Sequence, residues 1–163
     1  MRVPLSWLAE SVELQDRDPE RVLAALVRVG LEEEDVHRFS VSGPVVCGQV
    51  LSREPEPQTN GKTINWCQVR VAPDGQRAAD GGDPVRGIVC GAHNFEVGDK
   101  TVVTLPGSVL PGDFRISARK TYGHLSDGMM ASARELGLGA DHSGIVVLSR
   151  LGLDPEPGTP LLG

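Results

Sequence analysis

The chain has 163 residues and a formal net charge of −6, with 39% hydrophobic, 23% charged and 4% aromatic residues. A chain of this length forms one medium domain, or one domain with a small appendage, and buries a core without disulfide staples. The acidic balance excludes a protein that attracts phosphate backbones indiscriminately, and the few aromatic residues predict an aliphatic core.

The first forty residues predict helices. The stretch PLSWLAESV indicates a short helical turn after Pro4. Asp18 suits an N-cap, Pro19 the first helical position and Gly30 a left-handed stop, so a second helix is expected between them. The apolar stripe of that helix recurs at a 3.6-residue period and consists of Val22, Leu23, Leu26 and Val27.

From Gly43 onward, short β-rich runs alternate with turn residues. The five runs are PVVCGQVLSREPEP, KTINWCQVRVAP, VRGIVCGAHN, DKTVVTLPG and FRISARKTYG. Five runs favour a small barrel over a sandwich of seven or more strands. The stretch GQRAADGGDP at 75–84 predicts an exposed, mobile loop. Later, Ser132 and Glu135 match a capping box, which predicts a short helix ending at Gly137 or Gly139.

Neither catalysis nor metal binding has a signature. Asp141, His142 and Ser143 are neighbours in sequence, and the members of a catalytic triad converge from separated segments. No glycine-rich phosphate motif occurs, and Cys90 with His93 is a lone pair of metal-ligand types. We therefore expect no catalytic residue and no metal site. The odd number of spaced cysteines and the lack of a long apolar segment predict reduced thiols, no membrane span and a cytoplasmic location.

One stretch departs from the acidic average. Arg115, Arg119 and Lys120 lie within six residues and predict a local basic edge. The following Ser-Asp-Gly-Met at 126–129 combines a hydroxyl, a flexible glycine and an apolar side chain, which suits the edge and face of an unstacked RNA base. Cations beside it would meet phosphates. A plain turn explains the same four residues, and Met129 with Met130 also fits a core.

Four motifs that follow one another in order, together with two segments near the N-terminus, show a family resemblance. The motifs are CGAHN at 90–94, LPGSVLPG at 105–112, SDGM at 126–129 and SARELG at 132–137. With the opening MRVPLSWLAESV and the helix DPERVLAALVRVGLE, they resemble the bacterial phenylalanyl-tRNA synthetase beta subunit over essentially the whole chain.

The resemblance implies a mainly β fold. Residues 40–150 would form a five-stranded oligonucleotide-binding (OB) fold barrel of the tRNA-binding type, with the short late helix. Residues 1–39 would be the helical part of an incomplete α/β subdomain, to which residues 151–163 begin to return. The RNA-facing residues that it implies are Asn94, Arg115, Arg119, Lys120, Ser126, Gly128 and Met129.

The implied function is a non-catalytic tRNA-binding module with no cofactor of its own. Its parent enzyme would attach phenylalanine to tRNA with ATP and magnesium, and the chain would be an excised fragment. The implied partners are tRNA and an alpha subunit, in a heterotetramer of two alpha and two beta chains, with neither DNA nor a membrane.

Two departures from the family pattern weaken the expected grip on phosphate. Residues 55–60 (PEPQTN) replace a common His-Pro-Asn-Ala-Asp, and Tyr122-Gly123 stands where Arg-Gly is common. The alternative is therefore a structural or protein-interaction module of the synthetase with little RNA affinity.

Overall fold

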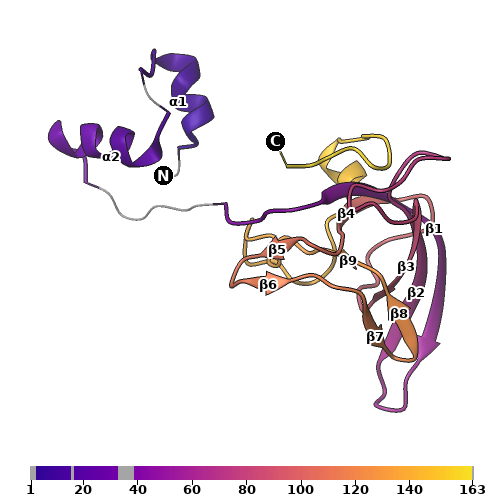
Figure 1. Ribbon diagram of the computed structural model, residues 1–163. Coiled ribbons are helices and arrows are strands. Elements are labelled where there is room, and N and C mark those ends of the chain that lie inside the picture. Colours follow the sequence, from indigo (N-terminus) through magenta and orange to yellow (C-terminus); the bar gives the residue numbers. More distant parts are fainter. Residues whose placement is uncertain (1–2, 16, 33–38, 163) are drawn as a thin grey trace. The chain divides into compact units, whose positions relative to one another are not determined.

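The computed structural model describes residues 3–15, 17–32 and 39–162 (Figure 1). The chain divides into two compact units, residues 1–38 and 39–163.

The first unit contains α1 (Leu5–Ser11) and α2 (Pro19–Arg28). The Asp18 side chain accepts a hydrogen bond from the Glu20 N–H at 3.1 Å, which caps α2. Gly30 has a φ of 90°, so the left-handed stop lies where the sequence predicts it. Neither helix buries a residue, and no helix in the described residues is long and apolar enough to cross a membrane.

The second unit is built on a five-stranded antiparallel sheet in the order β3-β2-β1-β4-β9. Its strands are β1 (Val45–Pro57), β2 (Thr63–Arg70), β3 (Val85–Cys90), β4 (Lys100–Thr104) and β9 (Met129–Met130). Two small hairpins precede β9: β5 (Val109–Leu110) with β6 (Phe114–Arg115), and β7 (Arg119–Thr121) with β8 (His124–Ser126). A 3-10 helix, η1, spans Leu148–Leu151.

The sheet curls until its ends nearly meet. The segment before β9 bonds to the outer edge of β3: the Asp127 N–H donates to the Gly87 carbonyl at 2.8 Å. The Val89 N–H donates to the Ser126 hydroxyl oxygen at 3.0 Å. These bonds satisfy edge groups that a flat sheet would leave open. The result is the predicted five-stranded, OB-like barrel.

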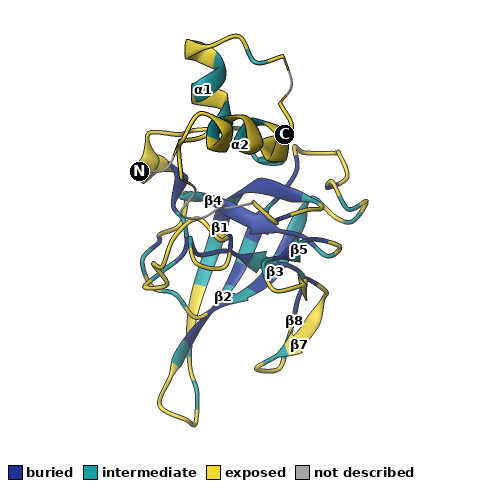
Figure 2. Ribbon diagram, turned by 90° about the vertical axis from the view of Figure 1, so that its left-hand side faces the viewer, coloured by how far each residue is buried: buried dark blue, intermediate teal, exposed yellow. Residues whose placement is uncertain are grey.

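Alternating residues of the strands fill two cores, one on each face of the sheet. On β4, Val103 lies in the barrel core and Val102 in the outer core; on β1, Val46 and Val45 divide in the same way. Both cores are mainly aliphatic, as expected, with the fully buried Phe95 as the large exception. Figure 2 shows the buried residues concentrated in the barrel strands.

The fifth predicted run, FRISARKTYG, does not form one strand. It is divided into β6 and β7, which belong to different hairpins, and the barrel takes its fifth strand from Met129–Met130. The break lies at Ile116, a buried residue whose N–H donates to the Ser108 carbonyl at 2.9 Å. Because Ile116 is buried here, Arg115 lies in one hairpin, and Arg119 and Lys120 lie in the other.

The short helix predicted at 132–139 is a hydrogen-bonded turn. Its capping box does form: the Ser132 N–H donates to the Glu135 carboxylate at 2.7 Å, and the Glu135 N–H donates to the Ser132 hydroxyl at 3.2 Å. Gly137, with a φ of 71°, then reverses the chain within one turn. The predicted cap is therefore confirmed, and the predicted short helix after it is wrong.

Most residues of the loop at 75–84 are exposed, as expected, but the loop is also anchored to the barrel. Ala78 within it is 5% exposed. The guanidinium of Arg86, 4% exposed, bonds to Asp80 in the loop at 2.5 Å and to Asp127 beside β9 at 2.8 Å. This one buried cation ties the loop to the segment that closes the barrel.

The end of the chain extends the barrel sheet. β2 occupies one edge of β1 only from Gln49 onward. Along the first half of that edge, the Cys47 N–H donates to the Thr159 carbonyl at 2.9 Å and the Leu161 N–H to the Val45 carbonyl at 2.9 Å. That residues 151–163 return to the N-terminal unit stays a prediction.

Candidate nucleic-acid interface

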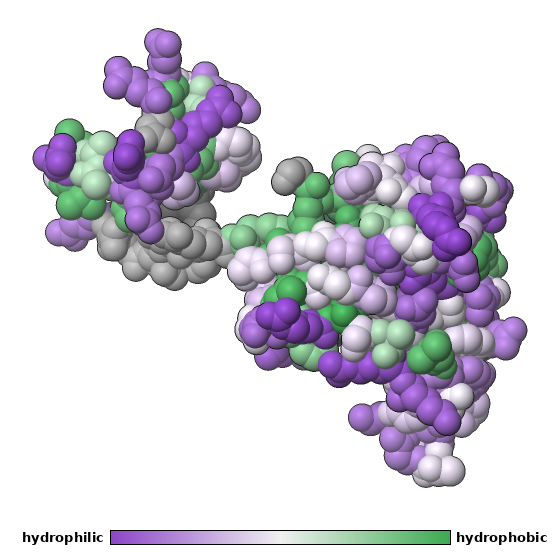
Figure 3. Space-filling model, in the orientation of Figure 1, coloured by the Kyte–Doolittle hydropathy of each residue, from purple (hydrophilic) through white to green (hydrophobic). Residues whose placement is uncertain are grey.

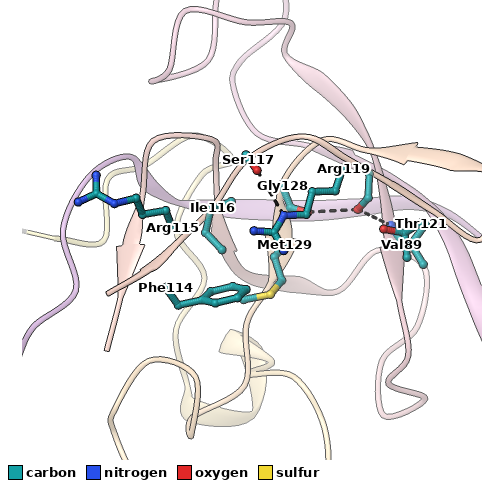
Figure 4. A pocket seen from close by; sticks show the side chains of 10 residues that line it. Val89, Phe114, Arg115, Ile116, Ser117, Arg119, Thr121, Gly128 and Met129 are labelled. Atoms are coloured by element: carbon teal, nitrogen blue, oxygen red, sulfur yellow. Dashed lines mark hydrogen bonds between the residues drawn. The ribbon is translucent and has the colours of Figure 1, made fainter. Parts of the chain in front are cut away.

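Five of the seven residues predicted to face RNA line one pocket of about 160 Å³ between the two hairpins and the barrel (Figure 4). They are Arg115, Arg119, Ser126, Gly128 and Met129. We call this the hairpin pocket. The hairpin pocket brings together residues of β6, β7, β8 and β9. The predicted basic run is divided between two hairpins, and the pocket lies where these hairpins meet the barrel.

The hairpin pocket has apolar walls below a cationic rim. Phe114, Ile116 and Val89 contribute the walls together with Met129. Phe114 is 46% exposed, and the Cζ atom of Arg119 lies 5.5 Å from its ring centroid, in cation–π geometry. Figure 4 shows Phe114, Arg119 and Met129 converging. Figure 3 shows hydrophilic and hydrophobic residues interspersed over the face that carries β5 to β8. Such a surface offers both a stacking platform and a phosphate partner.

The β7–β8 hairpin that carries Arg119 is held against the barrel by an aromatic stack. The rings of His124 and Trp66 lie parallel, with centroids 4.1 Å apart and 12° between their planes. The His124 Nε2 lies 2.9 Å from a Glu56 carboxylate oxygen. A Cβ added at Gly87 would collide with the Trp66 ring, so glycine leaves the space that the ring occupies on β3. The stack therefore sets the position of the basic hairpin.

Ser126 and Gly128 hold the barrel closed as well as lining the pocket. The Ser126 hydroxyl accepts from Val89 and donates to the Gly128 carbonyl at 3.2 Å, and the residue is 8% exposed. Gly128 has a φ of 122°, and a Cβ there would lie 3.1 Å from the Thr104 carbonyl oxygen. Both residue types are thus explained by the fold, and their contact with RNA stays a prediction.

Asn94 and Lys120 do not line the hairpin pocket. Both functional atoms of the Asn94 amide bond to the backbone of Ile145: Nδ2 donates to its carbonyl at 2.9 Å, and Oδ1 accepts from its N–H at 3.0 Å. Lys120 is exposed on β7, and no carboxylate of the described residues pairs with it. Asn94 therefore acts as a brace between two loops, whereas Lys120 is available to an anionic partner.

The sequence prediction did not include the apolar walls of the pocket, Val89, Phe114 and Ile116, or the two hydroxyl side chains that also line it, Ser117 and Thr121. A signal was present, because only six aromatic residues occur in the chain and Phe114 adjoins a cation directly after a Pro-Gly-Asp turn. An aromatic residue beside cations is the usual base-stacking combination.

The Asp141-His142-Ser143 stretch forms a local turn. The Asp141 carboxylate accepts from the Ser143 N–H at 2.9 Å and from the Ser143 hydroxyl at 2.7 Å. These two bonds hold the pKa of Asp141 below its usual range. Across residues 3–15, 17–32 and 39–162, no group of three or more His, Cys, Asp or Glu residues is placed to hold a metal ion.

A nearly closed, five-stranded antiparallel barrel of this kind belongs to the OB-like fold class. No protein-family model matches the sequence. The chain is 68% identical to the phenylalanine–tRNA ligase beta subunit of Leifsonia xyli over 97% of its length, and 52% identical to that of Bifidobacterium longum over 92%. The same subunit of Thermobifida fusca is 51% identical over 98% of the chain. The chain belongs with this beta-subunit family and spans about a fifth of the length of these relatives, 18–19%.

Proposed function

We propose that the barrel is a tRNA-contacting module of a phenylalanine–tRNA ligase beta subunit. The observation that carries the proposal is the hairpin pocket, where Arg119 lies over Phe114 and beside Met129. Arg115 also lines the pocket, and its guanidinium pairs with the exposed Asp113 at 3.3 Å. The cations would meet phosphates, and the apolar walls would receive a base. Asn94 would act indirectly, by fixing the loop at 91–95 to Ile145.

The wider setting is part of the same proposal and is supported by the names of the relatives. The parent enzyme would join phenylalanine to its tRNA in the cytoplasm with ATP and magnesium, through an alpha subunit paired with beta in a two-plus-two assembly. This segment would contribute binding and no chemistry, with no cofactor of its own.

The test is a titration of tRNA against the chain over a range of salt concentrations. The variant Arg119→Ala/Lys120→Ala should weaken binding and reduce the magnitude of the log–log salt slope by roughly 0.7–0.9 per charge removed. A matched control, Arg70→Ala/Arg77→Ala, removes two cations that do not line the hairpin pocket, and it should leave binding almost unchanged. Equal binding by the first variant and the wild type would refute the basic hairpin as the contact.

A structural or protein-interaction module is the second candidate. The observation in its favour is that the polar atoms of Asn94 and Ser126 are occupied by internal hydrogen bonds. Absence of tRNA binding at every salt concentration, from a chain that folds normally, would favour this candidate.

A further inference from the structure

A second pocket adjoins the hairpin pocket on the barrel surface. It has a volume of about 530 Å³, and Val89 and Met129 line both pockets. We call it the turn pocket, because it also takes in Ser132, Arg134 and Glu135 of the capping-box turn. Met129 therefore stands between two adjoining hollows.

We propose that the two pockets form one groove that takes two successive nucleotides of single-stranded RNA, one base on either side of Met129. This inference rests on the proposed function and specifies the chemistry of its ligand. A folded duplex keeps its bases stacked, so the groove requires a loop, an end or another unpaired stretch.

The hairpin pocket suits one small ring. Its 160 Å³ is close to the ~150 Å³ of an apolar cavity that holds a single benzene molecule. A pyrimidine fits such a space better than a two-ring purine. Phe114 and Met129 supply the apolar contacts, and the hydroxyls of Ser117 and Thr121 supply groups for a base edge. Arg119, above the Phe114 ring, lies at the rim where a phosphate would pass.

The turn pocket suits a whole nucleotide. Its volume falls within the ~300–1,000 Å³ of small-molecule sites. Met130 and Cys90, both largely buried, give it an apolar floor, and Arg134 and His142 give it polar groups at the edge. The one carboxylate in its lining, Glu135, accepts the Ser132 N–H at 2.7 Å, which directs it into the turn. Arg134 thus supplies one cation to the turn pocket, as Arg119 does to the hairpin pocket.

The experiment compares uridine monophosphate, the dinucleotide UpU, and the hexamers U6 and A6 at low salt, with backbone amide NMR shifts as the readout. Uridine monophosphate should shift Phe114, Ser117 and Thr121 of the hairpin pocket but not Ser143 and Gly144, whereas UpU should also shift Ser143 and Gly144 of the turn pocket. U6 should bind several-fold more tightly than A6.

Two variants test the hairpin pocket and the turn pocket separately. Phe114→Leu keeps an apolar side chain but removes the ring, and it should weaken U6 roughly 5- to 150-fold, the range for loss of one stacked base. Arg134→Gln should remove the gain of UpU over uridine monophosphate and leave the monophosphate affinity unchanged. Thermal melting checks that each variant is folded.

The outcomes distinguish the two proposals. If tRNA binds and Arg119→Ala/Lys120→Ala weakens it, but UpU causes no shift in the turn pocket or Arg134→Gln has no effect, the two-nucleotide groove is wrong while the tRNA module stands. If tRNA fails to bind at any salt concentration, the proposed function itself fails. If A6 binds as tightly as U6, the size argument for the hairpin pocket is wrong.

Discussion

Replacing Asn94 separates a structural brace from a direct RNA contact. Asn94→Ala removes both hydrogen bonds to the Ile145 backbone, of 2.9 and 3.0 Å. Ile145 is only 7% exposed, so water replaces those partners poorly. A neutral hydrogen bond contributes ~0.5–1.5 kcal/mol, so two predict a loss of about 1–3 kcal/mol in the free energy of unfolding.

Urea unfolding, followed by circular dichroism and extrapolated to zero denaturant, measures this loss. The matched control is Asn60→Ala, at an exposed turn where Asn60 Oδ1 accepts only the Lys62 N–H at 3.1 Å. That change should stay within about 0.5 kcal/mol, as for surface positions in general. An Asn94→Ala chain with the same urea midpoint as the control would refute the brace. Should that chain keep its stability and still lose tRNA binding, Asn94 would be a direct contact instead.

Three further changes test the barrel and its hairpin. Gly48→Ala should cost about 1–3 kcal/mol in thermal unfolding, because a Cβ there would collide with Val103 and stand 2.9 Å from Val69 Cγ1. Burial raises the pKa of Cys47 to about 11 and of Cys67 to about 12, so a thiol-specific chromogenic disulfide at pH 8 should react with them only in urea. The same shifts predict that the free energy of unfolding declines as the pH rises above the ordinary thiol pKa of about 8.5 toward these folded-state values. The reason is that the thiols of the unfolded chain ionise first, and removing the cysteines should therefore flatten the decline. Tyr122→Asn should stabilise the chain by up to ~1 kcal/mol in a chemical melt, because Tyr122 has a φ of 48° in the two-residue turn between β7 and β8; unchanged or lower stability would contradict the strain argument.

The local features of the fold could be predicted from the sequence because their causes act over a few residues. The Asp18 cap and the Gly30 stop of α2 formed as expected. The capping box also formed its bonds, although Gly137 limits it to a turn. Four of the five predicted β-rich runs became β1 to β4, since each is long enough to show an alternating or apolar pattern.

Longer-range features followed from tertiary structure alone. β9 has only two residues and carries no periodicity, so its role as the fifth barrel strand depends on pairing with β4 and on the bonds of Ser126 and Asp127 to β3. The anchoring of the loop at 75–84 could not be predicted, because the cation that holds it, Arg86, lies outside the loop in sequence.

The candidate site divides in the same way. The sequence by itself identified its residue types and several of its positions, because cations close together and a Ser-Asp-Gly-Met turn are visible in the letters. The tertiary structure decided which of them meet: burial of Ile116 splits the basic run, folds Phe114 toward Met129, and opens a pocket between the hairpins. Asn94 does not line the hairpin pocket, because its amide forms hydrogen bonds with the backbone of Ile145 at the edge of the core, where buried polar groups need partners. Residues that are close in sequence can indicate a binding surface, but long-range packing determines how deep the pocket is and which residues line it.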